Sequence, residues 1–205
     1  VGFEGLVYPW FDDDDHVISE HPETYDRVVY GVDWGFSNPA VALAVAFRGD
    51  QPVVLDEVYE ARLTDKDLAH EVAQLQAEYG DGVVYCDPAE PDSIEAFRRE
   101  GLDAVAADND VRPGIKAVAD TSDTLRVHEY AQNLINEFGQ YQYRDGGDSD
   151  KPRKENDHAM DALRYVIHTA EVGGNIPTGR ATFSESERDT SPGQTVGDIL
   201  PDPTR

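Results

Sequence analysis

Apolar residues recur along the first 170 residues of this chain at spacings typical of strands and helices. Arg27–Asp33 is an almost continuous apolar run that ends in an acid, which is typical of a buried central strand. Two β-rich segments follow, Ala40–Phe47 and Pro52–Tyr59, and the four residues Arg48–Gln51 between them predict a tight hairpin connection. The pattern therefore predicts a three-stranded antiparallel meander.

Helices and short strands are predicted to alternate after the meander. Thr64 and Asp67 resemble a capping box, and apolar residues then recur at helical spacing up to Tyr79. Further along, the sequence predicts strands at Gly82–Asp87 and Ala104–Ala107, helices at Pro91–Glu100, Gly114–Leu125, Tyr130–Phe138 and Asp157–Ala170, and a loop at Asp145–Asn156. The expected fold is α/β: a mixed five-stranded sheet, made of the meander and parallel strands, flanked by helices.

The composition favours one folded domain. The chain has 205 residues, of which 39% are hydrophobic, so it can bury one sizeable core. We expect a leader over residues 1–26, the domain over residues 27–170, and a flexible, disordered tail over residues 171–205, where Gly, Pro, Ser and Thr replace large apolar residues. No apolar run approaches the ~18 residues of a membrane span, so no membrane association is expected. The single cysteine, Cys86, excludes an internal disulfide framework and a thiolate zinc site.

The charge balance is strongly acidic. Asp and Glu number 42 against 17 Lys and Arg, which gives a formal net charge of −25. A DNA-binding protein is usually basic, so this balance weakens a DNA-binding interpretation. However, the acids are spread along the chain and lysine is scarce, as in proteins of extreme halophiles, and in 1 M salt a Debye length of about 3 Å would mute repulsion from phosphates. High-salt adaptation is therefore our interpretation.

Three segments carry acids at positions that suit catalysis. Asp33 and Asp87 each end a predicted buried strand, where a carboxylate is costly unless a cation or hydrogen-bond donors satisfy it. Asp157, His158 and Asp161 share one face of the last predicted helix through i,i+3 and i,i+4 spacing. Together these groups could hold two divalent cations, about 3.5–4 Å apart, around a phosphodiester. The pattern predicts a phosphodiesterase.

Each candidate also has a purely structural interpretation. Strand-end acids such as Asp33 and Asp87 often form turns or cap helices, and Asp157 stands where an N-cap residue would. His158 could face solvent. Arg164 could contact phosphate or form an i,i+3 salt bridge with Asp161. The acidic run at residues 12–15 is better interpreted as a solvated loop than as a metal site.

A basic cluster precedes the last predicted helix. Lys151, Arg153 and Lys154 form the densest positive stretch in the chain. Because phosphate contacts dominate DNA affinity, we expect this cluster to meet the DNA backbone. The alternative is a flexible solvated loop.

Six segments, in this order and spacing, resemble the carboxy-terminal nuclease domain of tailed-virus large terminases. They are GLVYPWFDDDDHVI, YGVDWGFSNPAVALAV, YCDPAEPDSIEAF, RPGIKAV, NLINEF and NDHAMDALRY. The resemblance covers roughly residues 4–170, and NDHAMDALRY is its most telling part. It implies a ribonuclease H-like endonuclease that cuts concatemeric viral DNA, with two Mg²⁺ or Mn²⁺ ions held by Asp33, Asp87 and the last helix. On that helix, the resemblance implies His158 and Asp161 as the first candidates for metal ligands and Asp157 as the second.

The resemblance also implies a larger assembly. Relatives carry an amino-terminal ATPase, yet GxxxxGK[ST] does not occur here, so we expect neither nucleotide binding nor ATP hydrolysis from this chain. The implied partners are double-stranded DNA, the ATPase domain, the portal and the small terminase subunit, in the cytoplasm of an infected cell and transiently at the procapsid portal. The composition further suggests a virus or provirus of a halophilic archaeon, and an imidazole ligand would favour Mn²⁺ over Mg²⁺.

Two other functions stay open at this stage. A resolvase or transposase would share the plan of strand acids and a helix acid, and would prefer branched DNA. A non-catalytic docking module between motor and portal would carry the acids only as surface. An actin-like sugar kinase is a weaker alternative, because the glycine-rich phosphate loops that it needs do not occur in this sequence.

Overall fold

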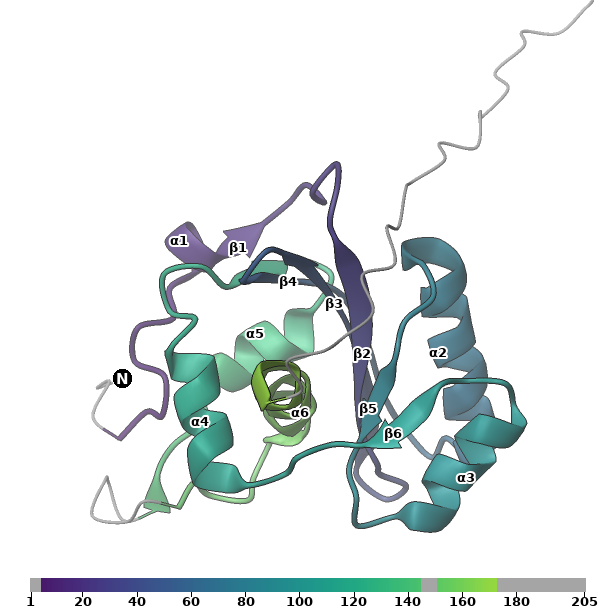
Figure 1. Ribbon diagram of the computed structural model, residues 1–205. Helices are drawn as coiled ribbons and strands as arrows, with labels where there is room; N and C mark the ends of the chain where they lie inside the picture. Colours follow the sequence, from purple (N-terminus) through teal and green to yellow (C-terminus); the bar gives the residue numbers. More distant parts are fainter. Residues whose placement is uncertain (1–4, 145–150, 173–205) are drawn as a thin grey trace, which may run out of the picture.

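A seven-stranded mixed sheet separates two layers of helices (Figure 1). The computed structural model describes residues 5–144 and 151–172. The strands are β1 (Val17–Ile18), β2 (Arg27–Asp33), β3 (Pro39–Arg48), β4 (Gln51–Ala61), β5 (Val84–Cys86), β6 (Ala104–Ala106) and β7 (Arg126–His128). Their order across the sheet is β1-β7-β4-β3-β2-β5-β6, and among these described strands only β3 runs antiparallel to its neighbours. The predicted meander β2–β3–β4 is therefore confirmed.

The prediction of five strands is wrong, because β1 and β7 were missed. They are two and three residues long, too short to show an alternating pattern. The predicted helix Gly114–Leu125 is also wrong in its bounds: α4 spans Val111–Ala119 and is followed by turns and β7. The polar residues after α4 favour turns, and the Thr121 hydroxyl donates a hydrogen bond back to the Val118 carbonyl over 2.7 Å.

The remaining helices lie close to their predicted positions. They are α2 (Asp65–Tyr79), α3 (Pro91–Arg99), α5 (Gln132–Phe138) and α6 (His158–Val172), whereas α1 (Asp13–His16) was not predicted. The capping box of α2 is confirmed, since the side chains of Thr64 and Asp67 each accept the other's backbone N–H. The acidic run at residues 12–15 is exposed to solvent, as expected, but it forms a helix cap and a short helix and not a loop, and the Asp12 carboxylate accepts the Asp14 N–H.

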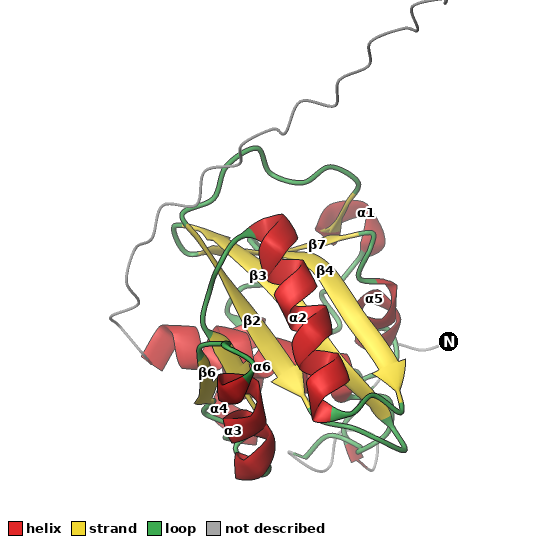
Figure 2. Ribbon diagram, turned by 90° about the vertical axis from the view of Figure 1, so that its right-hand side faces the viewer, coloured by secondary structure: helices red, strands yellow, loops and turns green. Residues whose placement is uncertain are grey.

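The helices α2 and α3 cover one face of the sheet, and α4, α5 and α6 cover the other (Figures 1 and 2). In β3 the large residues Val41, Leu43 and Val45 face the α6 layer, whereas alanines alternate with them on the α2 side. Small side chains let α2 approach the sheet closely, and large ones fill the space under α6. Both faces of the central strands are buried, which explains the continuous apolar run of β2.

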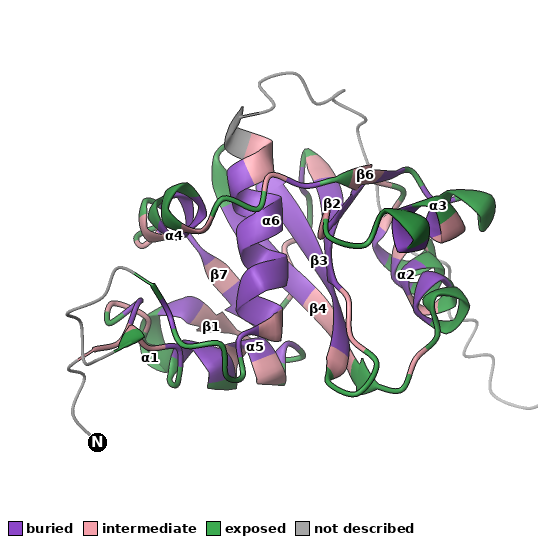
Figure 3. Ribbon diagram, turned by 90° about the horizontal axis from the view of Figure 1, so that it is seen from below, coloured by how far each residue is buried: buried purple, intermediate pink, exposed green. Residues whose placement is uncertain are grey.

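Helix α6 lies directly against β2. A Cβ atom built on Gly31 would stand 2.3 Å from the Ala162 carbonyl oxygen, so the missing side chain is what admits the helix. Figure 3 shows α6 as buried along most of its length, with α4 and α5 beside it. The helix that carries Asp157, His158 and Asp161 at its start is thus held by the core.

The residues before β2 also pack on the sheet. Tyr8 is 2% exposed and stacks on Tyr141, and β1 pairs with β7 at the sheet edge. The described part of the predicted leader therefore contributes to the core and the sheet. Residues 173–205 of the predicted tail, and residues 145–150 of the predicted loop, lie outside the described residues. Within the described ranges, no helix combines the length and apolarity needed to cross a membrane.

Candidate active site

The candidate site lies at the edge of the sheet where β2 and β5 end and α6 begins. These two strands are parallel neighbours with Val32 opposite Cys86, so Asp33 and Asp87 come next at the same level. Val29 and Tyr85 face the α6 layer, and strand alternation places the two aspartates on that side too. The strands and the helix thus bring the predicted acids together.

Asp33 is the most deeply placed of the strand-end acids. It is 7% exposed, and its Oδ2 lies 3.0 Å from Nδ1 of His158. Burial raises the pKa of Asp33 to about 6, against the lowering effect of His158, and the nearby carboxylates of Asp161 and Asp87 raise it further. A bound cation would stabilise the charged form of this buried carboxylate.

Asp87 is half-buried and has a structural role as well. Its Oδ1 accepts the Ala89 N–H over 3.0 Å, as a turn-forming aspartate does. Its backbone carbonyl accepts the Trp34 indole N–H over 3.2 Å, which ties the loop after β2 to the loop after β5. The turn interpretation and the ligand interpretation are compatible, because the second carboxylate oxygen remains available for a ligand.

The first turn of α6 carries a network of ion pairs. Asp161 is 6% exposed; its Oδ1 accepts a hydrogen bond from Arg164 Nη2 over 2.7 Å, and its Oδ2 accepts one from Lys154 Nζ over 2.9 Å. The predicted salt bridge between Asp161 and Arg164 is therefore confirmed, and Arg164, at 2% exposure, also donates to the Asn109 carbonyl. Asp157 directly precedes the helix, and Lys154 Nζ lies 3.4 Å from its Oδ2.

His158 occupies a position between solvent and the buried acid. The hydrogen bond with Asp33 raises the pKa of His158, against the opposing effect of partial burial. The imidazole is therefore held against Asp33. The alternative interpretation, in which His158 faces solvent, required a ring that projects freely. From this position the ring can orient the Asp33 carboxylate.

The chemistry of these side chains suits a hard divalent cation. Carboxylates from β2, the loop after β5, and α6 face one side of the sheet edge, and carboxylate oxygens are the ligands such ions prefer. As the side chains stand, no three His, Cys, Asp or Glu residues within residues 5–144 and 151–172 converge on one metal position. The reason is visible in the contacts: Asp161 is neutralised by Lys154 and Arg164, and Asp33 pairs with His158.

Two glutamates, which the sequence did not single out, fix the helices of the site: Glu137 is buried and Glu57 is half-buried. The Glu57 carboxylate in β4 accepts the N–H groups of Asn133 and Leu134 at the start of α5, and Glu137 in α5 accepts the Met160 N–H in the first turn of α6. Glu137 also accepts the Tyr59 hydroxyl over 3.0 Å. Each glutamate thus satisfies N–H groups that the helix itself leaves without partners. Glu137 is a positioning residue for the helix that carries His158 and Asp161.

Glu137→Gln is expected to flatten the pH dependence of stability. Burial raises the pKa of Glu137 from 4.5 to about 7, so its share of stability is complete below pH 4.5 and is lost as the pH rises through 7. Glutamine stays neutral. Its side-chain oxygen can accept the hydrogen bond from the Met160 N–H, and its NH₂ group can donate one to the Tyr59 hydroxyl oxygen. The variant should gain up to about 3 kcal/mol over wild type between pH 4.5 and pH 8, since one pKa unit corresponds to about 1.4 kcal/mol.

Chemical denaturation at several pH values measures this difference. Glu137→Ala, which removes the cap, should be less stable than wild type by about 1–2 kcal/mol at pH 4.5, and this deficit should shrink as the pH rises, because alanine does not titrate either. If the difference in the free energy of unfolding between Glu137→Gln and wild type were the same across this pH range, Glu137 would not titrate near neutrality in the folded protein.

The predicted basic cluster has a different arrangement from the one expected. Lys151 and Arg153 are exposed, as a DNA contact requires, but the Lys154 ammonium group lies on Asp161 and Asp157. Burial lowers the pKa of Lys154, but the hydrogen bond and charge of Asp161 outweigh it, so the net shift is upward. Lys154 is therefore part of the acid cluster in this structure.

Solved structures with similar folds include large terminases. The chain superposes on the large terminase of a thermophilic bacteriophage with a TM-score of 0.73 and 25% identity, over 81% of this chain and 46% of that one. The P22 large terminase nuclease domain gives a TM-score of 0.69 at 16% identity, over 82% of this chain and 93% of that domain. This chain has the ribonuclease H-like fold of large terminase nuclease domains.

Related nuclease domains have been solved with metal ions. The nuclease domain of the SPP1 large terminase, with bound Mn, gives a TM-score of 0.61 at 20% identity, over 78% of this chain and 97% of that one. This chain spans about half the length of the thermophilic-phage large terminase that it matches. No protein-family model and no curated protein matches the sequence.

Proposed function

We propose that this chain is the nuclease domain of a viral large terminase, and that it cuts concatemeric viral DNA during packaging by metal-dependent phosphodiester hydrolysis. The observation that carries the proposal is the meeting of strand-end and helix acids at one sheet edge, in which Asp33 lies 3.0 Å from His158 across 125 residues of sequence. The similarity in fold to the terminase nuclease domains of P22 and SPP1 supports it.

In this proposal Asp33, Asp87 and Asp161 hold two divalent cations, with His158 as a further ligand and Asp157 second in rank. When bound, such ions activate water and stabilise charge on the leaving oxygen. Arg164 and the core fix the position of Asp161, and Glu137 fixes the start of α6. Lys154 must leave Asp161 for that carboxylate to bind a cation. Its ammonium group then becomes available to a DNA phosphate, beside Lys151 and Arg153.

The proposed partners follow from the same similarity. They are double-stranded DNA, an ATPase domain in the longer protein, the portal and the small terminase subunit, in the infected host cytoplasm and transiently at the procapsid portal. The preference for Mn²⁺ rests on His158 as a ligand. The origin in a halophilic archaeal virus and the adaptation to high salt rest on composition alone and stay predictions.

Plasmid cleavage tests the function directly. The chain is incubated with supercoiled DNA at low salt and in molar KCl, with Mn²⁺, with Mg²⁺ and with a chelator. We expect nicked and linear products with either ion, more with Mn²⁺, and none with the chelator. The matched variant His158→Ala should lose the Mn²⁺ advantage if the imidazole is a ligand.

Two outcomes would contradict the proposal. Absence of cleavage by folded protein with both ions would favour a docking module between motor and portal. A strong preference for branched over linear duplex DNA would favour a resolvase. Better cutting with Mg²⁺ than with Mn²⁺ would count against His158 as a ligand only.

A further inference from the structure

A rigid loop next to the candidate site presents an aromatic side chain to solvent. Phe36 is 62% exposed, and with Tyr130 it makes up the large hydrophobic side chains that remain exposed among the described residues. A single exposed apolar residue is unremarkable by itself. What distinguishes Phe36 is its place, three residues after Asp33 in the connection from β2 to β3.

The loop around Phe36 is fixed at several points. Trp34 packs edge-on against Phe97, with ring centroids 4.7 Å apart, and its indole N–H is bonded to the Asp87 carbonyl. The Phe36 carbonyl accepts the backbone N–H of Arg62 over 2.9 Å, and Arg62 adopts a left-handed φ of 68° beside this contact. The backbone of Phe36 is therefore held in place while its side chain is exposed, so little backbone freedom remains to be lost when the residue binds a partner.

An open pocket adjoins Phe36 on the α2 and α3 side of the sheet. Its volume is about 310 Å³, and Trp34, Leu63 and Leu68 supply apolar lining. The rim carries the acids Asp65 and Glu90, which repel a phosphate. The start of α2 is already capped by its own Thr64, so it does not offer an anion site either. The pocket therefore suits a flat, uncharged group whose amino substituents can donate to carboxylates.

We propose that Phe36 stacks on a nucleobase that leaves the base stack of the bound DNA near the scissile phosphate, with the base lying against the pocket between Phe36 and Trp34. This inference rests on the proposed nuclease function. Three residues of extended chain span at most about 10 Å, and successive bases of a strand lie about 3.4 Å apart, so the base is within about three nucleotides of the phosphate at Asp33. Stacking on a base is tolerant of sequence, so the proposed contact does not require a particular base at this position.

DNA affinity at several KCl concentrations tests the stacking. Binding of a labelled duplex and of a labelled single strand is measured in an Asp33→Asn background, which prevents cutting. Phe36→Ala should weaken binding of the labelled single strand by about 5- to 100-fold, the range for loss of one aromatic–base stack, and should weaken binding of the duplex by less, because the duplex must first unstack the base. The slope of log affinity against log salt should not change, because no phosphate contact is lost. The matched control is Tyr130→Ala, which removes a similarly exposed ring. Tyr130 follows β7, which lies three strands away from β2, so this variant should bind DNA with the parent's affinity.

A second variant reports the contact by fluorescence. Phe36→Trp should retain the parent's affinity, and its added indole emission should be quenched by DNA beyond any change in the parent, which has Trp10 and Trp34. Three results would overturn the inference: an affinity of Phe36→Ala equal to the parent's, a smaller salt slope for Phe36→Ala, or no added quenching in Phe36→Trp. The first result would favour a protein partner for Phe36. If the Asp33→Asn parent does not bind DNA and the wild-type protein does not cut it, the proposed function itself fails.

Discussion

Asp33→Ala is expected to abolish DNA cleavage while leaving the protein folded. The change removes a carboxylate that belongs to the proposed metal site at the end of β2. Loss of a group that only orients a ligand typically costs 10- to 100-fold, so loss of a ligand should lower the cleavage rate by more than about 100-fold. Because burial raises the pKa of Asp33 to about 6, a neutral side chain there should not lower stability at pH 7.

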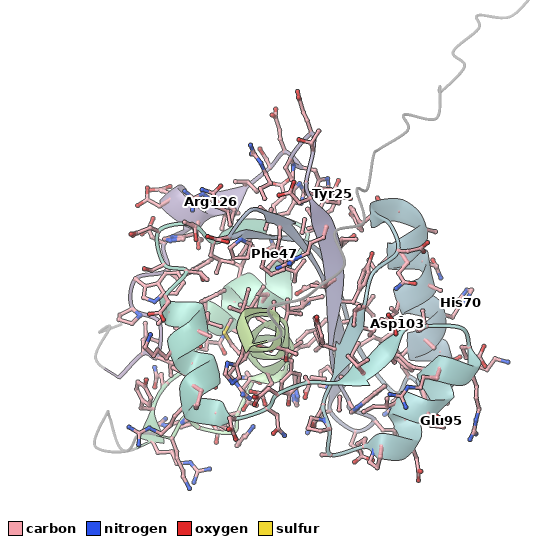
Figure 4. The ribbon with its side chains drawn as sticks, in the orientation of Figure 1. Tyr25, Phe47, His70, Glu95, Asp103 and Arg126 are labelled. Carbon is pink, nitrogen blue, oxygen red and sulfur yellow. The ribbon has the colours of Figure 1, made fainter. Side chains whose placement is uncertain are left out.

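Cleavage rates and thermal unfolding, measured together, check this expectation. Asp161→Asn should lose cleavage to a similar degree, since it removes the charge that α6 contributes. The matched control is Asp103→Asn, an exposed aspartate that directly precedes β6, at the opposite ends of the parallel strands (Figure 4). Cleavage by Asp33→Ala at more than a tenth of the wild-type rate would remove Asp33 from the set of metal ligands.

Gly31→Ala is expected to destabilise the protein by about 3 kcal/mol and to reduce cleavage as well. The added methyl group would lie 2.3 Å from the Ala162 carbonyl and 2.6 Å from a Val166 methyl group, so α6 must move away from β2. Overpacking of a buried contact typically costs about 1–3 kcal/mol, and a backbone clash belongs at the upper end. In a domain of this size, the midpoint of thermal unfolding should fall by about 6–12 °C.

The control for Gly31→Ala is Gly139→Ala. Gly139 has an ordinary φ of −74°, and a Cβ there would meet its nearest neighbour, the Asn136 carbonyl, at 3.6 Å, an ordinary contact. That variant should unfold within about 2 °C of wild type. Equal unfolding midpoints for the two variants would mean that α6 is not held against β2 at Gly31.

The sequence predicted the central elements because their patterns are long. The seven apolar-rich residues of β2 and the capping box of α2 carry local signals that survive in the structure. Strands β1 and β7 could not be predicted in this way. β1 and β7 exist because they pair with each other and with β4, and two or three residues contain too little pattern to show it.

The candidate site was predictable as a set of acids but not as a network. Strand ends and helix spacing suffice to indicate Asp33, Asp87 and Asp161 as neighbours. No local signal indicates that Lys154 lies on Asp161, or that Glu57 and Glu137 cap helices far away in sequence, because these contacts depend on how the helices pack. Their charges were visible only as part of a very acidic composition.

The position of α6 at the end of the described region has a consequence for synthesis of the protein. The proposed acids of the two strands precede α6 in the chain, and the pair between Asp33 and His158 closes across 125 residues. A growing chain that has not yet released α6 from the ribosome also has no core contact to cover β2 at Gly31. Translation must therefore pass almost the whole described region before a complete site can form, so an incomplete product of translation carries only part of the proposed nuclease.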